Sequence, residues 1–426
     1  MQTKCIFLIV FHFVTLQIAQ AYEWTHWRGP HYDGTVDVEA GSFPVGWKDK
    51  DIVWKTALPG MAGGTPVVKN GKIFVITTAG NHTEVRAICI DQKSGQVLFD
   101  KKIDSARKFP LEGHCASPSP VVDEERVYFM TGKARFVALD HQGDLIWERD
   151  LVAELGPFDH HFGYSSTPYL EDGKLFVMAL RGFKIKTVDS LLLALDAKTG
   201  KTVWQVKRES EALHESPLSF SSPLPTELDG QKIMMVWGAD YITAHSHTDG
   251  QELWRYGYMG DNPRMRNWRQ VATPVIGDGI LFHPLPRGKT MHALKLNADK
   301  YEKIWEYTGD VPDVCNPTYK DGLIYFLHGA ERTMTCLEGK TGKHIWTKQL
   351  DGGEIYRASP VLVDGKLICL SVDGQVNILK AGKKPELLTA FNIGQTGCLA
   401  TPVIVDHHIY IRSTENLLSI KPSGSL

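Results

Sequence analysis

The chain repeats one short pattern eight times along its length. Each copy has a small residue followed by proline, an apolar run, a turn such as Asp172-Gly173, and a second apolar run. Consecutive repeat prolines lie 42 to 55 residues apart, and repeats of this length built from several short strands are typical of β-propeller blades. The eight prolines are Pro66, Pro120, Pro168, Pro223, Pro274, Pro317, Pro360 and Pro402.

The composition of each copy predicts four antiparallel strands. Asp-Gly and Asn-Gly accept the positive φ of a tight hairpin, and the runs between them are rich in Val, Ile, Leu, Tyr and Phe. Several copies close with a segment such as ALDAKTGKTVW, residues 194–204. We expect its tryptophan to lie on the outermost strand and to pack between neighbouring sheets. These closing residues are Trp147, Trp204, Trp254, Trp305 and Trp346.

The last copy lacks this closing segment. A segment of the same kind, residues 51–60 with Trp54, precedes the first copy instead. An N-terminal strand that completes the C-terminal blade would close the ring and leave no open sheet edge. We therefore predict an all-β fold, an eight-bladed β-propeller over residues 51–426, with residues 22–50 as an extension packed on it.

The first 21 residues predict export. Lys4 precedes an apolar stretch from Cys5 to Ile18, and Ala19-Gln20-Ala21 has the small residues of a cleavage site. We expect a periplasmic or secreted chain, cleaved near Ala21, with no membrane span in its mature part. The formal net charge of −2 argues against a nucleic-acid partner, and we expect a monomer.

The cysteines beyond the predicted signal peptide lie mostly inside apolar runs. None are adjacent and none have C-x-x-C spacing, so zinc and redox sites are not indicated. Buried free thiols are expected instead. The six are Cys89, Cys115, Cys315, Cys336, Cys369 and Cys398.

The whole repeat, from Ser/Thr-Pro to the closing tryptophan, resembles the repeats of the pyrroloquinoline quinone (PQQ)-like propeller superfamily. That superfamily includes quinoprotein alcohol dehydrogenases and the propeller lipoprotein of the outer-membrane assembly machine. Residues 24–34 (WTHWRGPHYDG) and 156–168 (GPFDHHFGYSSTP) are similar to exported bacterial PQQ-like repeat proteins. The resemblance implies the fold; function has to be argued from the site, because one fold carries many activities.

In such a ring, the segments before the repeat prolines meet at one mouth of the central channel. They are rich in His, Arg, Tyr and Trp, which supply proton transfer, forked donors for anions, and stacking faces. We predict a site for an anionic small molecule or glycan, and leave open whether the protein is an enzyme. The alternative is a set of ordinary polar loops. The predicted acid/base residues are His114, His160, His161 and Tyr164, and the predicted ligand-binding residues are His214, Glu215, Arg266, Trp268, Arg269, Asn316, Glu354, Tyr356 and Arg357.

Three other functions stay open. A polysaccharide lyase or hydrolase would use the histidines, Tyr164 and the arginines as base, acid and countercharge. A PQQ-dependent dehydrogenase would place calcium among Glu215, Asn316 and Asp313 and stack the quinone on Trp268. The resemblance implies adjacent cysteines for such an enzyme, and this chain has none, so PQQ with calcium is not favoured. The last alternative is a platform that binds a cell-envelope protein.

Three further motifs have structural interpretations. His245 and His247 share a strand face but have no evident third ligand, so we predict solvated hairpin residues and no metal site. Arg28 in the WRGP segment is expected to pair with a carboxylate in a clasp outside the ring. The stretch DHHIY, residues 406–410 with His407 and His408, aligns with the Asp-Gly turn of other copies and is expected to form that turn.

Overall fold

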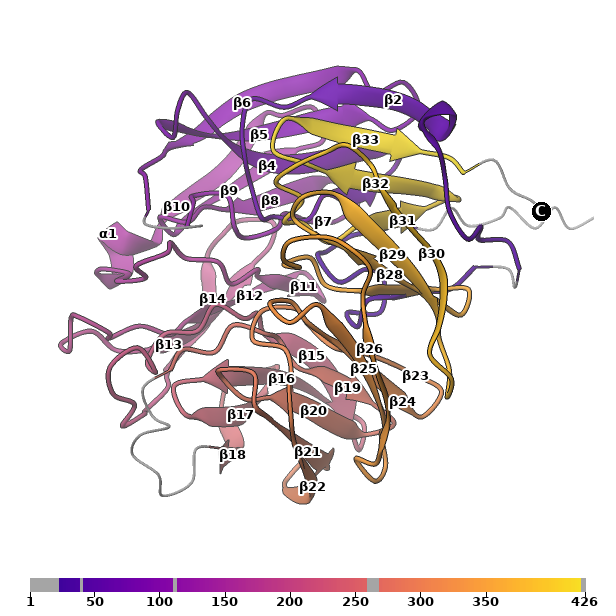
Figure 1. Cartoon of the computed structure of the whole chain (residues 1–426). Coiled ribbons are helices and arrows are strands. Elements are labelled where there is room, and N and C mark those ends of the chain that lie inside the picture. The colour runs from indigo at the N-terminus through magenta and orange to yellow at the C-terminus, as the bar shows by residue number, and fades with distance from the viewer. Residues whose placement is uncertain (1–22, 39–40, 110–112, 259–267, 423–426) are drawn as a thin grey trace, which may run out of the picture.

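The computed structural model describes residues 23–38, 41–109, 113–258 and 268–422, and places eight sheets around a central axis (Figure 1). Every inner strand begins directly after a repeat proline. The predicted eight-bladed propeller with four-stranded antiparallel blades is therefore confirmed. The predicted signal peptide, residues 1–21, lies outside the described residues.

Blades 1 to 4 each contain four consecutive strands. They are β3 (Val67–Lys69), β4 (Lys72–Ala79), β5 (Glu84–Asp91) and β6 (Val97–Ser105); β7 (Val121–Val122), β8 (Arg126–Met130), β9 (Arg135–Asp140) and β10 (Leu145–Asp150); β11 (Tyr169–Glu171), β12 (Lys174–Ala179), β13 (Leu191–Asp196) and β14 (Thr202–Lys207); and β15 (Leu224–Leu228), β16 (Gln231–Gly238), β17 (Tyr241–Ser246) and β18 (Glu252–Gly257).

Blades 5 to 7 follow the same order, and blade 8 has three strands from the C-terminal end. They are β19 (Val275–Gly277), β20 (Ile280–Pro284), β21 (Thr290–Leu296) and β22 (Tyr301–Thr308); β23 (Thr318–Lys320), β24 (Leu323–His328), β25 (Thr333–Glu338) and β26 (His344–Gln349); β27 (Val361–Val363), β28 (Lys366–Leu370), β29 (Gln375–Lys380) and β30 (Glu386–Asn392); and β31 (Val403–Val405), β32 (His408–Arg412) and β33 (Asn416–Ile420). The described helices are η1 (Asp49–Asp51) and α1 (Leu151–Leu155).

Blade 8 is closed by β2 (Ile52–Ala57), as predicted. This strand pairs antiparallel with β33, with Trp54 opposite Ser419. The first strand of the propeller thus becomes the outermost strand of the last blade, which joins the two ends of the ring in one sheet (Figure 1).

The closing tryptophans tie neighbouring blades together. The indole N–H of Trp147 in blade 2 donates to the Ala197 carbonyl of blade 3 over 2.9 Å, and the Trp147 ring packs against Gly200. At Gly200, φ is +70° and an added Cβ would lie 2.7 Å from the indole, so the turn needs glycine for both reasons. Equivalent bonds from Trp54, Trp204, Trp305 and Trp346 confirm the predicted packing.

The residue before each repeat proline belongs to a circular hydrogen-bonded array, which we call the hydroxyl belt. In seven of the eight members, the side chain accepts from the backbone N–H of the equivalent residue in the preceding blade, as when Thr167 accepts from Ser119 over 2.9 Å. These seven bonds are 2.5 to 3.3 Å long. Ser or Thr therefore recurs at this position because its hydroxyl bonds to the preceding blade. The belt is Thr65, Ser119, Thr167, Ser222, Thr273, Asn316, Ser359 and Thr401.

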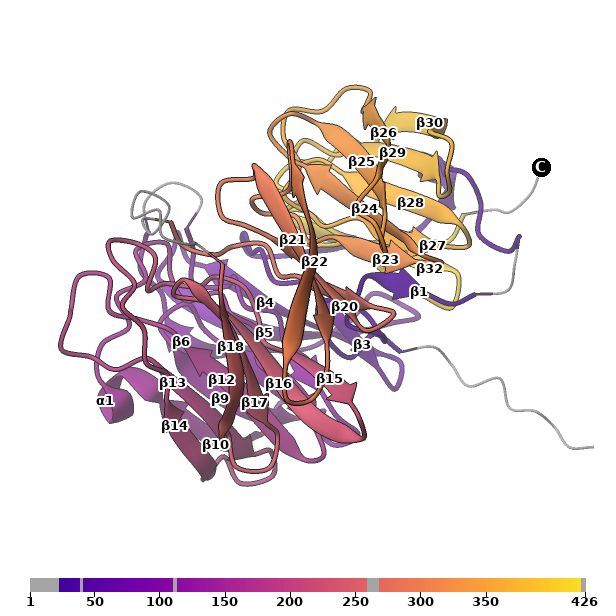
Figure 2. The same ribbon diagram turned by 90° about the horizontal axis from the view of Figure 1, so that it is seen from below.

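The described extension crosses the end of the channel opposite the mouth. Trp24 exchanges backbone bonds with Val68 of blade 1, and the Tyr32 hydroxyl donates to a carbonyl of blade 3. The chain then forms β1 (Thr35–Val36), which pairs parallel with inner strand β27 of blade 7, as Figure 2 shows. These contacts with separate blades close this end of the channel.

Arg28 has different partners from those predicted. Its guanidinium is 2% exposed and donates to the Asp33 carbonyl, the Pro317 carbonyl and the Thr318 hydroxyl. Within the part of the chain that the structure describes, no ion pair joins Arg28 to a carboxylate. The prediction that Arg28 pairs with a carboxylate is therefore wrong. Desolvation in this position lowers the pKa of Arg28 to about 10.

Of the remaining sequence predictions, two are confirmed and one is wrong. The six described cysteines are buried free thiols, as expected, and Asp406-His407 forms the predicted turn with positive φ at both residues. His245 and His247 are 1% and 5% exposed, so the prediction of solvated hairpin residues is wrong. Among the described residues, no helix has the length and hydrophobicity needed to cross a membrane.

Candidate functional site

The centre of the ring holds a cavity of about 230 Å³, which we call the central well. Its wall is the hydroxyl belt, and Trp27 of the extension lines it from the closed end. The residues on the mouth side of the belt are Gly63, His114, Ser117, Ser165, Phe220, Val271, Val314, Arg357 and Leu399. All eight blades therefore contribute to one small cavity, in which polar and apolar side chains are mixed.

Three of the predicted residues, from blades 3, 4 and 5, meet at the mouth. Glu215 lies between the other two: its carboxylate oxygens are 3.4 Å from His161 Nε2 and 3.1 Å from an Arg269 nitrogen. We call these three residues the His161 cluster. Burial lowers the pKa of His161, so its imidazole is neutral at neutral pH. A neutral imidazole held by a carboxylate is able to accept a proton.

Aromatic rings surround the His161 cluster. The His161 ring lies 4.0 Å from Phe162 and 5.3 Å from Phe183, and the Arg269 guanidinium stands 5.4 Å from the Phe162 ring. Phe220, which lines the central well, completes the set. These phenylalanines are partly exposed, so they offer ring faces to a ligand at this side of the mouth.

Two other predicted acid/base residues are buried in the protein. Tyr164 is 1% exposed, and its hydroxyl donates to the Met178 carbonyl over 2.9 Å. Burial raises the pKa of this phenol far above its usual range, so it is not placed to act as a base. His160 is 2% exposed among aromatic rings, and burial lowers its pKa to about 4. The sequence interpretation expected both side chains to point to the channel axis, whereas both are buried in the protein.

His114 does reach the central well. Its Nδ1 accepts from the backbone N–H of Ala116, and burial lowers the pKa of the imidazole to about 3. The well therefore contains a neutral imidazole at its wall.

A second cavity of about 270 Å³ opens beside the well, and we call it the side pocket. It shares Val314 and Arg357 with the well and adds Arg287, Lys289 and His328. The Arg287 guanidinium lies 3.1 Å from the centre of the Trp268 ring, which places that predicted residue beside the pocket. Asp313 and Glu331 also line it, so the lining contains three basic side chains and two carboxylates, besides His328.

The sequence pattern predicted Arg357 but not the other basic side chains of the side pocket. Arg287 and Lys289 lie between the second and third strands of blade 5, and His328 ends the second strand of blade 6. The predicted residues all precede repeat prolines, whereas these three lie at the connections between second and third strands, which open on the same face.

The remaining predicted residues have varied positions. His214 and Glu354 are exposed outside both cavities. Tyr356 is among the residues that line the side pocket, but it is fully buried and its hydroxyl accepts from Asn377. Arg266 lies outside the described residues.

The oxygens considered for calcium do not fit that ion. The Asn316 amide is used by the belt: its oxygen accepts from Thr273 N–H and its nitrogen donates to Ser359. Glu215 is held by Arg269 and His161, and Asp313 accepts from the Arg287 backbone. Each candidate oxygen already has a protein partner, so these residues do not fit a calcium ion beside PQQ.

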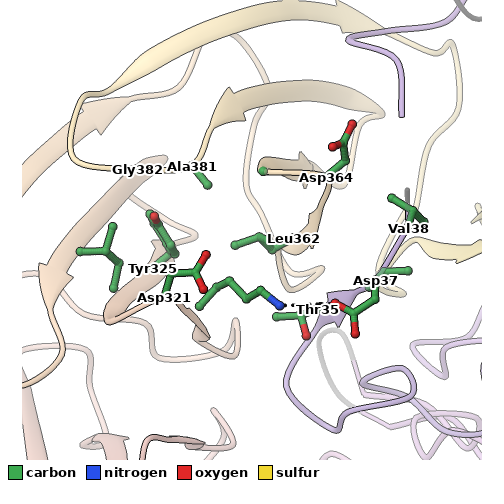
Figure 3. Close-up of a pocket in the computed structure, with 13 residues that line it drawn as sticks. Thr35, Asp37, Val38, Asp321, Tyr325, Leu362, Asp364, Ala381 and Gly382 are labelled. Carbon is green, nitrogen blue, oxygen red and sulfur yellow. Dashed lines mark hydrogen bonds and ion pairs between the residues drawn. The ribbon is translucent and has the colours of Figure 1, made fainter. Parts of the chain in front are cut away.

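A larger cavity of about 350 Å³ lies at the opposite end of the propeller, between β1 and blades 6 and 7 (Figure 3). Its charges are paired within the protein. Lys320 lies 3.3 Å from Asp37, and the Asp364 carboxylate accepts from the backbone N–H groups of Gly41 and Phe43. This cavity is the seam where the extension packs on the blades, and it is separate from the mouth.

Comparisons with known proteins agree with this architecture. Among curated relatives, outer membrane protein assembly factor BamB of Yersinia pestis is 24% identical over 235 residues, 55% of this chain and 51% of that protein. Quinoprotein alcohol dehydrogenase PedH of Pseudomonas putida is 24% identical over 151 residues, 33% of this chain and 24% of the dehydrogenase. The chain thus spans about half or less of the length of these relatives.

Solved structures share the fold across most of the chain. BamB from Moraxella catarrhalis superposes with a TM-score of 0.60 at 15% identity, covering 87% of this chain and 99% of that one. A europium-containing methanol dehydrogenase gives 0.69 at 12% identity, with 92% and 90% covered. A family model described as outer membrane protein assembly factor BamB matches residues 44–156 and 86–284, which together exceed half of the chain. The protein therefore belongs to this BamB-like family of PQQ-like propellers.

Proposed function

We propose that this protein is an exported propeller that binds an anionic small molecule, most favourably an acidic glycan, at the channel mouth. The observation that carries the proposal is the position of Arg357, which lines both the central well and the side pocket. Together with Arg287 and with Lys289, which pairs with Asp310 over 2.6 Å, it places three cationic side chains on one half of the mouth. Guanidinium groups present forked donors that match carboxylate and sulfate oxygens.

The other half of the mouth favours a sugar over a small inorganic anion. Phe162, Phe183 and Phe220 supply partly exposed rings, and Glu215 supplies a hydrogen-bond acceptor. Glu215 also neutralises Arg269, so the negative charge of a ligand is best placed at the side pocket. An acidic oligosaccharide would rest its ring faces on the phenylalanines and its carboxylates or sulfates on the arginines.

Calorimetric titration tests this proposal. We expect oligogalacturonate or chondroitin sulfate to bind to the full chain, with affinity that falls as salt rises, and a neutral maltooligosaccharide not to bind. Arg287→Ala should weaken binding about tenfold, which corresponds to about 1.4 kcal/mol. The matched control is Lys380→Ala, an exposed cation of blade 7 remote from the mouth, which should leave the affinity unchanged. Equal effects of the two variants, or no binding of any acidic glycan, would contradict the proposal and favour a protein-binding platform.

The His161 cluster supports a second candidate, acid/base cleavage of such a glycan. His161 would accept a proton from the sugar, with Glu215 orienting the imidazole and Arg269 close to the developing negative charge. We expect wild-type protein to release unsaturated uronate, measured by its ultraviolet absorbance, and His161→Gln to abolish release while glycan affinity changes less than about twofold. If the wild type binds the glycan but releases no product, the cleavage hypothesis is wrong and only the binding proposal stands.

A further inference from the structure

Three potential metal ligands from two blades meet at the end of the propeller opposite the mouth. Glu171 ends the inner strand of blade 3, Asp172 follows it in the turn, and His247 follows β17 of blade 4. One ligand atom from each residue lies within 4.8 Å of the others. The sequence pairs His247 with His245, whereas the fold brings it to carboxylates more than 70 residues away.

Backbone contacts fix the position of His247. Its N–H donates to the Lys232 carbonyl over 3.2 Å, and its carbonyl accepts from the closing Trp204 of blade 3 over 3.3 Å. The imidazole packs 4.5 Å from the Phe176 ring and is 95% removed from solvent. His245, by contrast, uses both ring nitrogens on Gly250 and Thr243, so it is not available as a ligand.

The imidazole of His247 points at a carboxylate without bonding to it. Its Nε2 lies 3.2 Å from Glu171 Oε2, yet this nitrogen is buried and has no hydrogen-bond partner among the described residues. A neutral imidazole nitrogen and a carboxylate oxygen both offer lone pairs, and a cation between them would satisfy both. With Zn–N and Zn–O bonds of about 2.0 Å, the edge of a zinc tetrahedron is about 3.3 Å, close to the observed separation.

Lys232 is the cation that now balances the two carboxylates. Its Nζ is 2.6 Å from Asp172 and 3.9 Å from Glu171, and its side chain is 42% exposed. A long, exposed lysine side chain is free to swing into solvent when a divalent ion takes its place. Lys232 would therefore compete with a metal for this site.

We propose that Glu171, Asp172 and His247 form a Zn²⁺ site that joins blades 3 and 4. One imidazole and two carboxylates are ligands that zinc accepts, and three protein ligands leave a fourth position for water. The site is independent of glycan binding, because it lies at the other end of the propeller.

Titration of the metal-free full chain with Zn²⁺, in competition with a chromogenic chelator, tests this site. We expect one Zn²⁺ per chain, a higher Tm in its presence, and an anomalous scattering peak between His247 and Glu171 in crystals grown with zinc. Asp172→Asn should weaken binding at least about tenfold. This substitution suits the backbone, because φ at Asp172 is +49° and asparagine tolerates that region. His247→Gln should abolish binding.

Lys232→Met makes the test specific. Removing the competing ammonium should strengthen Zn²⁺ binding at least about tenfold, whereas a merely structural role of the cluster predicts no gain. His31→Gln is the matched control, because His31 pairs with Asp37 in a second, exposed His-carboxylate contact and should not change the affinity. Unchanged zinc affinity in both Asp172→Asn and Lys232→Met, or no saturable binding by the wild type, would overturn the proposal.

Discussion

Acidification from pH 6.5 to about 4.5 is expected to unfold this protein cooperatively. Burial lowers the pKa of His26 and His114 to about 3, and the pKa of His160, His245 and His292 to about 4. In the unfolded chain a histidine takes up a proton below about pH 6.5. The folded state excludes that proton, so stability is fully present above pH 6.5 and is lost as pH falls toward the folded-state pKa.

The loss is large because the effects of these histidines add. Each one lowers the free energy of unfolding by about 1.4 kcal/mol per pH unit within this window. Urea titrations followed by tryptophan fluorescence at several pH values measure the slope. His114→Gln should reduce the slope by about one proton, whereas His407→Gln, in an exposed turn, should not. A free energy of unfolding that is constant between pH 7 and 5 would contradict this prediction.

The second large effect is expected at the tryptophan joint between blades 2 and 3. Trp147→Ala should lower the free energy of unfolding by about 3–5 kcal/mol, because it opens a cavity against Gly200. Trp147→Phe retains most of the buried ring but leaves the Ala197 carbonyl without its donor, which should cost about 1–3 kcal/mol. Chemical denaturation measures both values.

Trp254 offers the matched control. It occupies the equivalent position in blade 4 and is 8% exposed, but its buried indole N–H has no hydrogen-bond partner. Trp254→Phe should therefore be less destabilising than Trp147→Phe, since no hydrogen bond is lost. The opposite order would show that ring volume, and not the indole bond, determines the strength of the joint.

The fold was predictable because its contacts repeat. Each copy carries its own proline and hydroxyl-belt residue, and most copies add a turn and a closing tryptophan, so the same evidence recurs along the chain. Blade closure by β2 followed from one missing segment and one extra segment. Arg28 was not predictable in this way, because its partners are two carbonyls and a hydroxyl that only the folded extension brings together.

The site was only partly predictable. His161, Glu215 and Arg269 were found because they occupy equivalent places in successive repeats, and the ring brings equivalent places together. The direction of each side chain was not fixed by its place in the repeat, so Tyr164 and Tyr356 turned into the blade interfaces. The contact of His247 with Glu171 and Asp172 was not predicted, because these carboxylates come from another blade.

The extension beneath the central well has a consequence for the order of events at this site. Because Trp27 and its neighbours cover one end, a molecule in the well enters and leaves through the same opening. A protein that settled on that face would trap a bound ligand and would exclude one that had not yet arrived. Binding would then follow a fixed order: the small molecule binds before the protein docks, and it leaves only after the protein has dissociated.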